Sequence, residues 1–250
     1  SARDAAFANI LVGPKQVKFI VHENLLVQYS EFFRAALTGK FKEAEEKTVK
    51  LEEDDTTTFE LFVHWLYYQR FPNKAHGDHN ELIKLYHDDL DCGTNSCIQL
   101  HVFGDKYGVK RLKEDSLDEL INITLSGNNH CLTDADDVKL AFEHLPERSP
   151  MCRLIIDSHC LYGDPRRYQA FAAYTCIPFL HGVWLRHSDL LMKSEEEDQV
   201  QSPDITRCDY HEHENDEEKE ACKKKQKRAR ASVRAQVKVS DFESESETER

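Results

Sequence analysis

The spacing of apolar residues changes abruptly within residues 17–37. Apolar residues first occupy every second position, the period of a half-buried strand: Val17, Phe19 and Val21. They then recur at helical spacing: Leu25, Leu26, Tyr29, Phe32, Phe33, Ala36 and Leu37. We therefore expect a strand that runs directly into two short apolar helices, with Ser30 capping the second helix and Gly39 ending it in a left-handed conformation.

The flanking sequence supplies the other elements of a small α+β domain. Residues 8–12 form an apolar run before a Gly-Pro turn and predict a strand that makes a hairpin with residues 17–21. The alternation in residues 48–51 predicts a third strand. Helical spacing over residues 57–69, 98–107 and 109–121 predicts three longer helices. The first of these can be capped by one of residues 54–57, and Thr57 with Glu60 matches a capping box.

Short motifs within this pattern resemble those of the BTB/POZ domain. They are His22-x-x-x-Leu26, then Ser30-x-Phe32-Phe33, and, at the end of a later helix, Asp105-Lys106-Tyr107. The motifs and the predicted strands follow one another in the family's order over residues 8–122. The resemblance implies the BTB/POZ fold, which is a protein-interaction module and not an enzyme.

The rest of the chain falls into three further segments. Residues 73–97 lack a regular pattern, apart from one short helix that could begin at Glu81, and are interpreted as an insertion within the domain. Residues 123–192 keep helical spacing and resemble the helical extension that follows BTB domains in many fungal proteins. Residues 193–250 are rich in acidic residues, serine and lysine, with almost no aromatic residues, and predict a disordered tail.

Composition excludes several classes of function. The chain has 250 residues, with 33 Lys and Arg against 46 Asp and Glu, so its formal net charge is -13. This charge argues against direct binding of nucleic acid through a basic surface. No apolar run approaches the roughly 20 residues of a membrane span, and no apolar leader opens the sequence, so we expect a soluble, intracellular protein without membrane partners. The 8 cysteines are scattered, and most are interpreted as reduced thiols.

The sequence contains no motif typical of a catalytic or cofactor site, such as a phosphate-binding loop or a nucleophile elbow. We therefore expect neither enzymatic activity nor a cofactor. Two groups of residues have the side chains that bind metals: Cys208, His211, His213 and Cys222, and His87, Cys92, Cys97 and His101. Neither group has a standard spacing of structural zinc sites, so no metal site is predicted.

A charged loop after the central helices carries Phe41 and, two residues later, Glu43. In BTB proteins that bind cullins, a hydrophobic-x-Glu motif in this loop contacts the cullin, so the resemblance implies a substrate adaptor of a cullin-RING ubiquitin ligase. Alternatively, Phe41 packs back onto its own domain and Glu43 is a solvated charge. The second functional hypothesis is a nuclear BTB scaffold or transcriptional regulator without a role in ubiquitin ligation.

Self-association is common in the BTB family, but this chain departs from the usual pattern. Dimerising members have an aspartate before the first strand and a basic residue after the histidine that starts the first helix. Here those places hold Phe7-Ala8 and Glu23. Because an unpaired buried glutamate is costly, we do not expect dimerisation through the usual charge pair. The alternatives are a monomer and self-association through a different interface.

A basic cluster in the predicted tail resembles a nuclear localisation signal of the one-cluster type. Its cations are Lys223, Lys224, Lys225, Lys227, Arg228 and Arg230. The resemblance implies binding to an import receptor and residence in the nucleus, in addition to or instead of the cytoplasm. Alternatively, the cluster is a solvated segment whose charge balances the neighbouring acidic runs.

Overall fold

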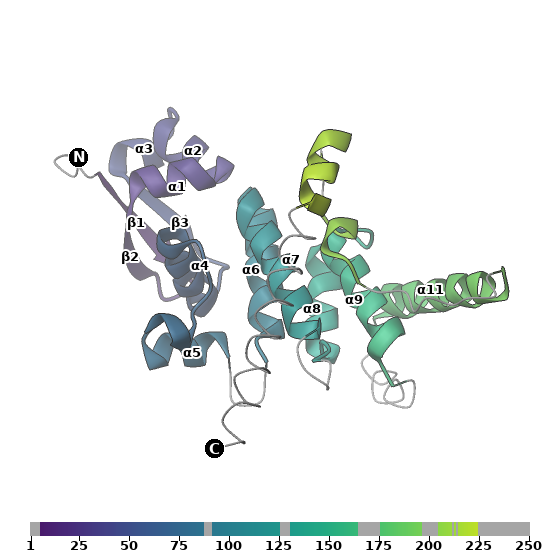
Figure 1. The fold of residues 1–250 in the computed structure, drawn as a ribbon. Coiled ribbons are helices and arrows are strands. Elements are labelled where there is room, and N and C mark those ends of the chain that lie inside the picture. Colours follow the sequence, from purple (N-terminus) through teal and green to yellow (C-terminus); the bar gives the residue numbers. More distant parts are fainter. Residues whose placement is uncertain are drawn as a thin grey trace, which may run out of the picture. The chain divides into compact units, whose positions relative to one another are not determined.

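The computed structural model describes most of the chain, and Figure 1 shows its elements in order. The chain divides into two compact units, residues 1–204 and residues 205–250. The residues that the structure describes are 6–87, 92–125, 131–164, 176–196, 205–211, 213 and 215–224. Each unit is described below by itself.

A three-stranded sheet opens the first unit. Strand β1 (Phe7–Val12) pairs antiparallel with β2 (Val17–His22) and parallel with β3 (Thr48–Leu51), so the strand order is β2-β1-β3. Ile10 lies opposite Phe19 on one side and Val49 on the other. All three predicted strands are confirmed, and the tight turn between β1 and β2 uses Gly13 at φ 71°, as the Gly-Pro signal indicated.

Three short helices connect β2 to β3: α1 (Glu23–Tyr29), α2 (Glu31–Thr38) and α3 (Lys42–Glu46). Ser30 caps α2, as predicted, because its hydroxyl accepts a hydrogen bond from the Phe33 amide at 3.1 Å. The same hydroxyl donates to the Tyr107 carbonyl at 2.7 Å, and Ser30 is fully buried. Ser30 therefore ends α1 through its backbone amide, begins α2 through its hydroxyl and holds α2 against a residue far along the chain.

Gly39 ends α2, but the predicted left-handed conformation is wrong. Its φ is -75° and its ψ is -164°, which is extended backbone. A Cβ atom on Gly39 would lie 2.4 Å from the Ala35 carbonyl oxygen. Glycine is therefore required here because the chain passes too close to the preceding turn for any side chain.

A cluster of aromatic rings from α2 and from residues 59–107 lies in the core of the first unit. Helix α4 (Thr56–Tyr68) begins at Asp55, whose carboxylate accepts from the Thr58 amide, so the cap is Asp55 and not the Thr57 capping box. The rings contact one another with centroids 4.6 to 6.4 Å apart; they are Phe33, Phe59, Phe62, Phe103 and Tyr107. Burial of these large rings contributes to the hydrophobic stabilisation of the domain.

The predicted insertion at 73–97 contains a short 3-10 helix (Lys74–His76) and helix α5 (Asn80–Tyr86). Asp78 orders the chain before α5, because its carboxylate accepts from both terminal nitrogens of Arg70 and from the Asn73 amide. These hydrogen bonds hold the pKa of Asp78 well below its usual range. Helix α6 (Thr94–Lys106) begins inside the predicted insertion, four residues before the helix that the sequence indicated at residue 98.

Helix α7 (Lys110–Leu125) packs against α6 and runs through the boundary predicted at residue 122. The extension continues with α8 (Ala135–His144), α9 (Pro150–Tyr162) and α11 (Ile177–Glu196). Helix α8 is capped by Asp134, and α9 by Ser149 with Pro150 in its first turn. The helical spacing of apolar residues therefore correctly predicted that the extension is built of helices.

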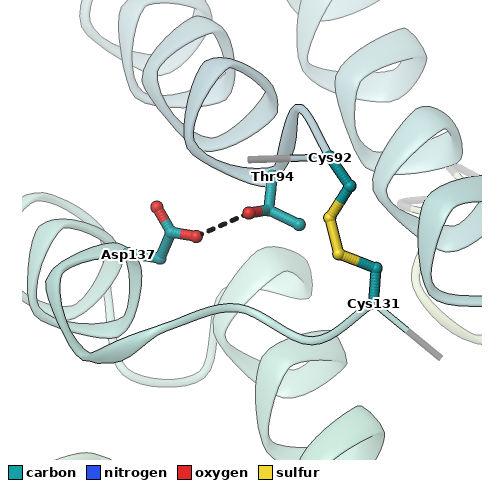
Figure 2. Close-up of a disulfide and its surroundings, with 4 residues drawn as sticks. All are labelled: Cys92, Thr94, Cys131 and Asp137. Atoms are coloured by element: carbon teal, nitrogen blue, oxygen red, sulfur yellow. Dashed lines mark hydrogen bonds between the residues drawn. A yellow bond between two sulfur atoms is a disulfide. The ribbon is translucent and has the colours of Figure 1, made fainter. Parts of the chain in front are cut away.

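A polar contact and a disulfide join α6 to the extension (Figure 2). Asp137 on α8 is buried and accepts from the Thr94 hydroxyl at 2.7 Å and from the Asn95 amide group at 2.8 Å. Cys92, just before α6, forms a disulfide with Cys131, just before α8. The sequence pattern did not indicate this pairing, whereas the other six cysteines are free thiols, in agreement with the expectation for most of them.

The predicted tail begins with ordered structure. Helix α11 continues to Glu196, and in the second unit a 3-10 helix (Arg207–Asp209) is followed by a helix at residues 216–224. Asn215 caps that helix by accepting from the Glu218 amide at 2.8 Å. The remaining parts of the predicted tail, 197–204 and 225–250, lie outside the described residues.

His101 on α6 predicts a dependence of stability on pH. The ring is only 2% exposed, and its Nδ1 lies 3.0 Å from the Lys113 carbonyl oxygen, so Nδ1 carries the proton and donates it. Burial lowers the pKa of His101 from 6.5 to about 4. Because protonation is easier in the unfolded chain, the folded state is favoured above pH 6.5, and that advantage is lost as the pH falls towards 4.

We expect protonation of His101 to lower the free energy of unfolding by about 3 kcal/mol between pH 6.5 and pH 4. Urea unfolding at several pH values between 4 and 6.5 should show a smaller loss of stability in His101→Gln than in the wild type. Glutamine can still donate to the Lys113 carbonyl but does not titrate. Parallel pH profiles for the two proteins would contradict this role of His101.

Candidate protein-interaction site

The loop expected around Phe41 contains the short helix α3, and Phe41 stands at its start. Its side chain is 63% exposed, and the φ of -90° at Phe41 is typical of a residue that precedes a helix. Glu43 lies in the first turn of α3 and is also exposed. None of the residues of α3 is buried, so this short helix presents one aromatic ring among charged side chains. The alternative in which Phe41 packs into its own domain does not fit this exposure.

Lys47 fixes the end of α3 to the body of the domain. It adopts a left-handed conformation with φ 49° and ends the helix. Its ammonium donates to Glu23 Oε1 at 2.7 Å and to the Leu37 carbonyl at 3.0 Å. The start of α1, the end of α2 and the end of α3 therefore meet at one cation, which sets the position from which Phe41 projects.

Glu23 is the residue that the sequence marked as a departure from the dimerising pattern. Its side chain is 13% exposed, as expected for a residue at the start of α1 that faces the domain. It is not unpaired, however, because Lys47 neutralises it within the same chain. Lys47 thus offsets the charge of the glutamate, whereas Glu23 Oε2 is buried without a hydrogen-bond partner among the described residues. Self-association stays a prediction to be tested on its own.

The residues of the family motifs form the framework of the domain. His22 precedes α1 and makes a 2.6 Å hydrogen bond through Nδ1 with the Tyr67 hydroxyl on α4. Leu26, with Phe33, is fully buried, whereas Phe32 is 39% exposed and packs its ring against Tyr107 at 4.9 Å. These contacts hold the helices together.

The Asp105-Lys106-Tyr107 motif ends α6 and contacts two neighbouring segments. Asp105 accepts from Lys113 at 2.7 Å, and Lys106 forms an ion pair with Asp54 at 3.0 Å. The Tyr107 hydroxyl donates to the same Asp54 carboxylate, and burial, followed by this hydrogen bond, raises the pKa of Tyr107. The motif therefore ties α6 to the segment before α4, which is a structural role.

The extension presents a second exposed surface, on α11. Ile177, Trp184 and Leu191 follow one another at intervals of seven residues and are 74%, 65% and 66% exposed. Residues at that spacing share one side of a helix. Opposite this stripe, Phe179 is 1% exposed and packs its ring on Phe142 of α8. Helix α11 is thus held by one side and leaves an apolar stripe on the other.

The remaining candidate residues belong to the segment after residue 204. Lys223 and Lys224 are exposed at the end of the helix at 216–224, whereas Lys225, Lys227, Arg228 and Arg230 lie outside the described residues. The structure brings together Cys208, His213 and Cys222. It does not form the other candidate metal group, since Cys92 is in the disulfide and His101 donates to a carbonyl.

The fold is that of a small α+β interaction domain with a helical extension. A scan of family models matches residues 3–122 to the BTB/POZ domain. Residues 3–122 therefore form a BTB/POZ domain, and domains of this family are non-enzymatic modules of protein-protein interaction. A search of curated proteins finds no match to the chain.

Within the part of the chain that the structure describes, no helix has both the length and the apolar character needed to cross a membrane.

The contact between Lys47 and Glu23 predicts a measurable effect on stability. Lys47→Met keeps most of the aliphatic side chain and removes the ammonium group, which leaves a mostly buried carboxylate without its cation and the Leu37 carbonyl without this donor. We expect a loss of about 1–2 kcal/mol in the free energy of unfolding, less than for a fully buried pair because Lys47 is partly exposed. Adding Glu23→Gln should recover part of this loss.

The matched control is Lys42→Met on the same helix. Lys42 pairs with Glu46 at 3.2 Å, but both side chains are more than half exposed. Its removal should change the stability by no more than about 0.5 kcal/mol. Equal losses for the two variants in urea unfolding would show that Lys47 does not anchor the helix.

Proposed function

We propose that this protein is a substrate adaptor of a cullin-RING ubiquitin ligase and that α3 is its cullin-binding element. The observation that carries the proposal is the exposed ring of Phe41 beside the exposed carboxylate of Glu43. A 63% exposed phenylalanine gains free energy when a partner covers it, since its contact with water is then removed. The carboxylate adds orientation and selects a partner with a basic or polar rim.

The anchoring of α3 supports this role. An anchor residue contributes most when its backbone is already held in the bound position, because little conformational entropy is then lost on binding. Lys47 provides such restraint from one side of α3, and the close passage of Gly39 past Ala35 provides it from the other. The motif is thus presented on a short, restrained helix.

An adaptor needs a second surface that recruits the client. We assign this role to the helical extension. The apolar stripe of Ile177, Trp184 and Leu191 on α11 is the feature that supports the assignment. Its spacing suits a client segment that is itself an amphipathic helix.

The second candidate is a nuclear BTB scaffold without a role in ubiquitin ligation. The exposed Lys223 and Lys224 at the start of the basic cluster favour it, because an import receptor needs accessible cations. Under both candidates we propose that the cluster directs part of the protein to the nucleus. The two differ in whether α3 binds a cullin.

Calorimetric titration of the full chain with a cullin N-terminal domain from the source organism separates the two candidates. We expect a Kd in the micromolar range or below. Phe41→Ala should weaken binding by about tenfold or more, because it removes the apolar anchor. Glu43→Lys should weaken it by a similar factor by reversing the charge at the edge of the contact.

Two control variants match the exposure and the chemistry of these changes. Ile20 on β2 is 62% exposed, so Ile20→Ala removes a comparable apolar group elsewhere. Glu60 on α4 is exposed, so Glu60→Lys makes the same charge reversal away from α3. Both should leave the Kd within about twofold. Absence of binding by the wild type, or equal weakening by the control variants, would refute the adaptor role of α3.

A further inference from the structure

The second unit gathers metal-binding side chains from three places in a short stretch of chain. Cys208 lies in the 3-10 helix, His213 follows five residues later, and Cys222 lies in the helix at 216–224. One ligand atom from each of the three lies within 4.8 Å of the others. Residues that are up to fourteen positions apart in the sequence therefore converge on one point.

The distances suit a tetrahedral ion with sulfur and nitrogen ligands. Cys208 Sγ lies 3.3 Å from His213 Nε2. Bond lengths of about 2.3 Å to sulfur and about 2.0 Å to nitrogen place two such ligands about 3.6 Å apart on a tetrahedral Zn²⁺. The side chains are thus close to the separation that a shared ion would impose.

A fourth donor stands next to this group. His211 Nδ1 lies 3.2 Å from Cys222 Sγ, and the rings of His211 and His213 have centroids 5.9 Å apart. The four residues have the order Cys-x2-His-x-His-x8-Cys. This spacing is not one of the common zinc patterns, which is why the sequence alone did not predict a site.

The composition of the segment explains what the ion would do. All residues from 215 to 221 are exposed, so the helix at 216–224 has almost no apolar side with which to pack. A helix of this length is marginal by itself in water. The contacts between this helix and the preceding turn include those of the cluster, such as the Cys208 thiol with the Lys219 carbonyl at 3.7 Å. A metal ion can supply folding free energy that so small a core cannot.

We propose that Cys208, His213 and Cys222, with His211 as the fourth ligand, bind a structural Zn²⁺ ion. The mixture of thiolate and imidazole ligands favours zinc over calcium or magnesium, which prefer oxygen. Four protein ligands leave no open position for catalysis, so the role is structural. The ion fixes the helix whose last described residues, Lys223 and Lys224, begin the basic cluster, and so links metal loading to the presentation of that cluster.

Zinc content of the full chain tests the proposal. The protein should be purified without a histidine tag, under reducing conditions and after growth with added zinc, and the metal measured by mass spectrometry after gel filtration. We expect about one Zn²⁺ per chain. Cys208→Ser and Cys222→Ser should each reduce the content to the background of the buffer.

Matched variants control for cysteine and histidine content. Cys176→Ser removes a free, partly exposed cysteine of the first unit, and His79→Asn removes an exposed histidine; both should keep the full zinc content. His211→Asn should weaken zinc binding by about tenfold or more in competition with a chelator, as expected for the loss of one ligand. An unchanged affinity would remove His211 from the site.

Replacement of zinc by Co²⁺ gives a second readout that does not depend on stability. A tetrahedral cobalt site with thiolate ligands has intense visible and charge-transfer absorption, which Cys208→Ser and Cys222→Ser should abolish. Circular dichroism should show that these variants keep the folded first unit. Reduced wild-type protein with no more zinc than the two cysteine variants, or a Cys208–Cys222 disulfide that persists in reductant, would overturn the proposal.

Discussion

The hydroxyl group of Ser30 joins two parts of the domain that are 77 residues apart in the sequence. It accepts from the Phe33 amide at the start of α2 and donates to the Tyr107 carbonyl at the end of α6. Because Ser30 is fully buried, water cannot replace either partner. The bond therefore fixes how the helix pair after the sheet meets the helices that close the domain.

The aromatic core is built around this bond. Phe33 and Tyr107 have ring centroids 5.9 Å apart, and both rings contact further aromatic residues of α4 and α6. A polar bond at the centre of an apolar cluster permits fewer arrangements than packing alone, since any shift would leave a buried carbonyl without a donor. The helices α1 and α2 are held in one position, and α3 extends from them with Phe41 exposed.

The sequence predicted those features that depend on neighbouring residues. The strand at residues 17–21, the cap at Ser30 and the helix at residues 57–69 were predicted from local patterns, and all three elements are present in the structure. The sequence predicted a left-handed conformation at Gly39, which was wrong. Glycine is needed there because the backbone passes close to Ala35, and a local sequence pattern does not show such an approach. The family motifs predicted a BTB/POZ domain, and the family match to residues 3–122 confirms it.

Local sequence patterns did not predict the contacts between residues that are far apart in the sequence. Glu23 forms an ion pair with Lys47, which offsets its buried charge, and only the fold brings these two residues together. The disulfide between Cys92 and Cys131 spans 39 residues, with no motif at either end. The group around Cys208 has suitable ligand types but an unusual spacing, so its convergence needed a structure.

Hydrogen-deuterium exchange of the full chain, with and without a saturating cullin N-terminal domain, tests the central claim most directly. The account predicts that binding slows exchange in residues 38–47 and leaves the edge strand β2 unchanged, because α3 carries the contact. Residue-level analysis of the amides from Thr38 to Lys47 would locate the effect. Unchanged exchange at α3, or protection confined to another surface, would contradict the account.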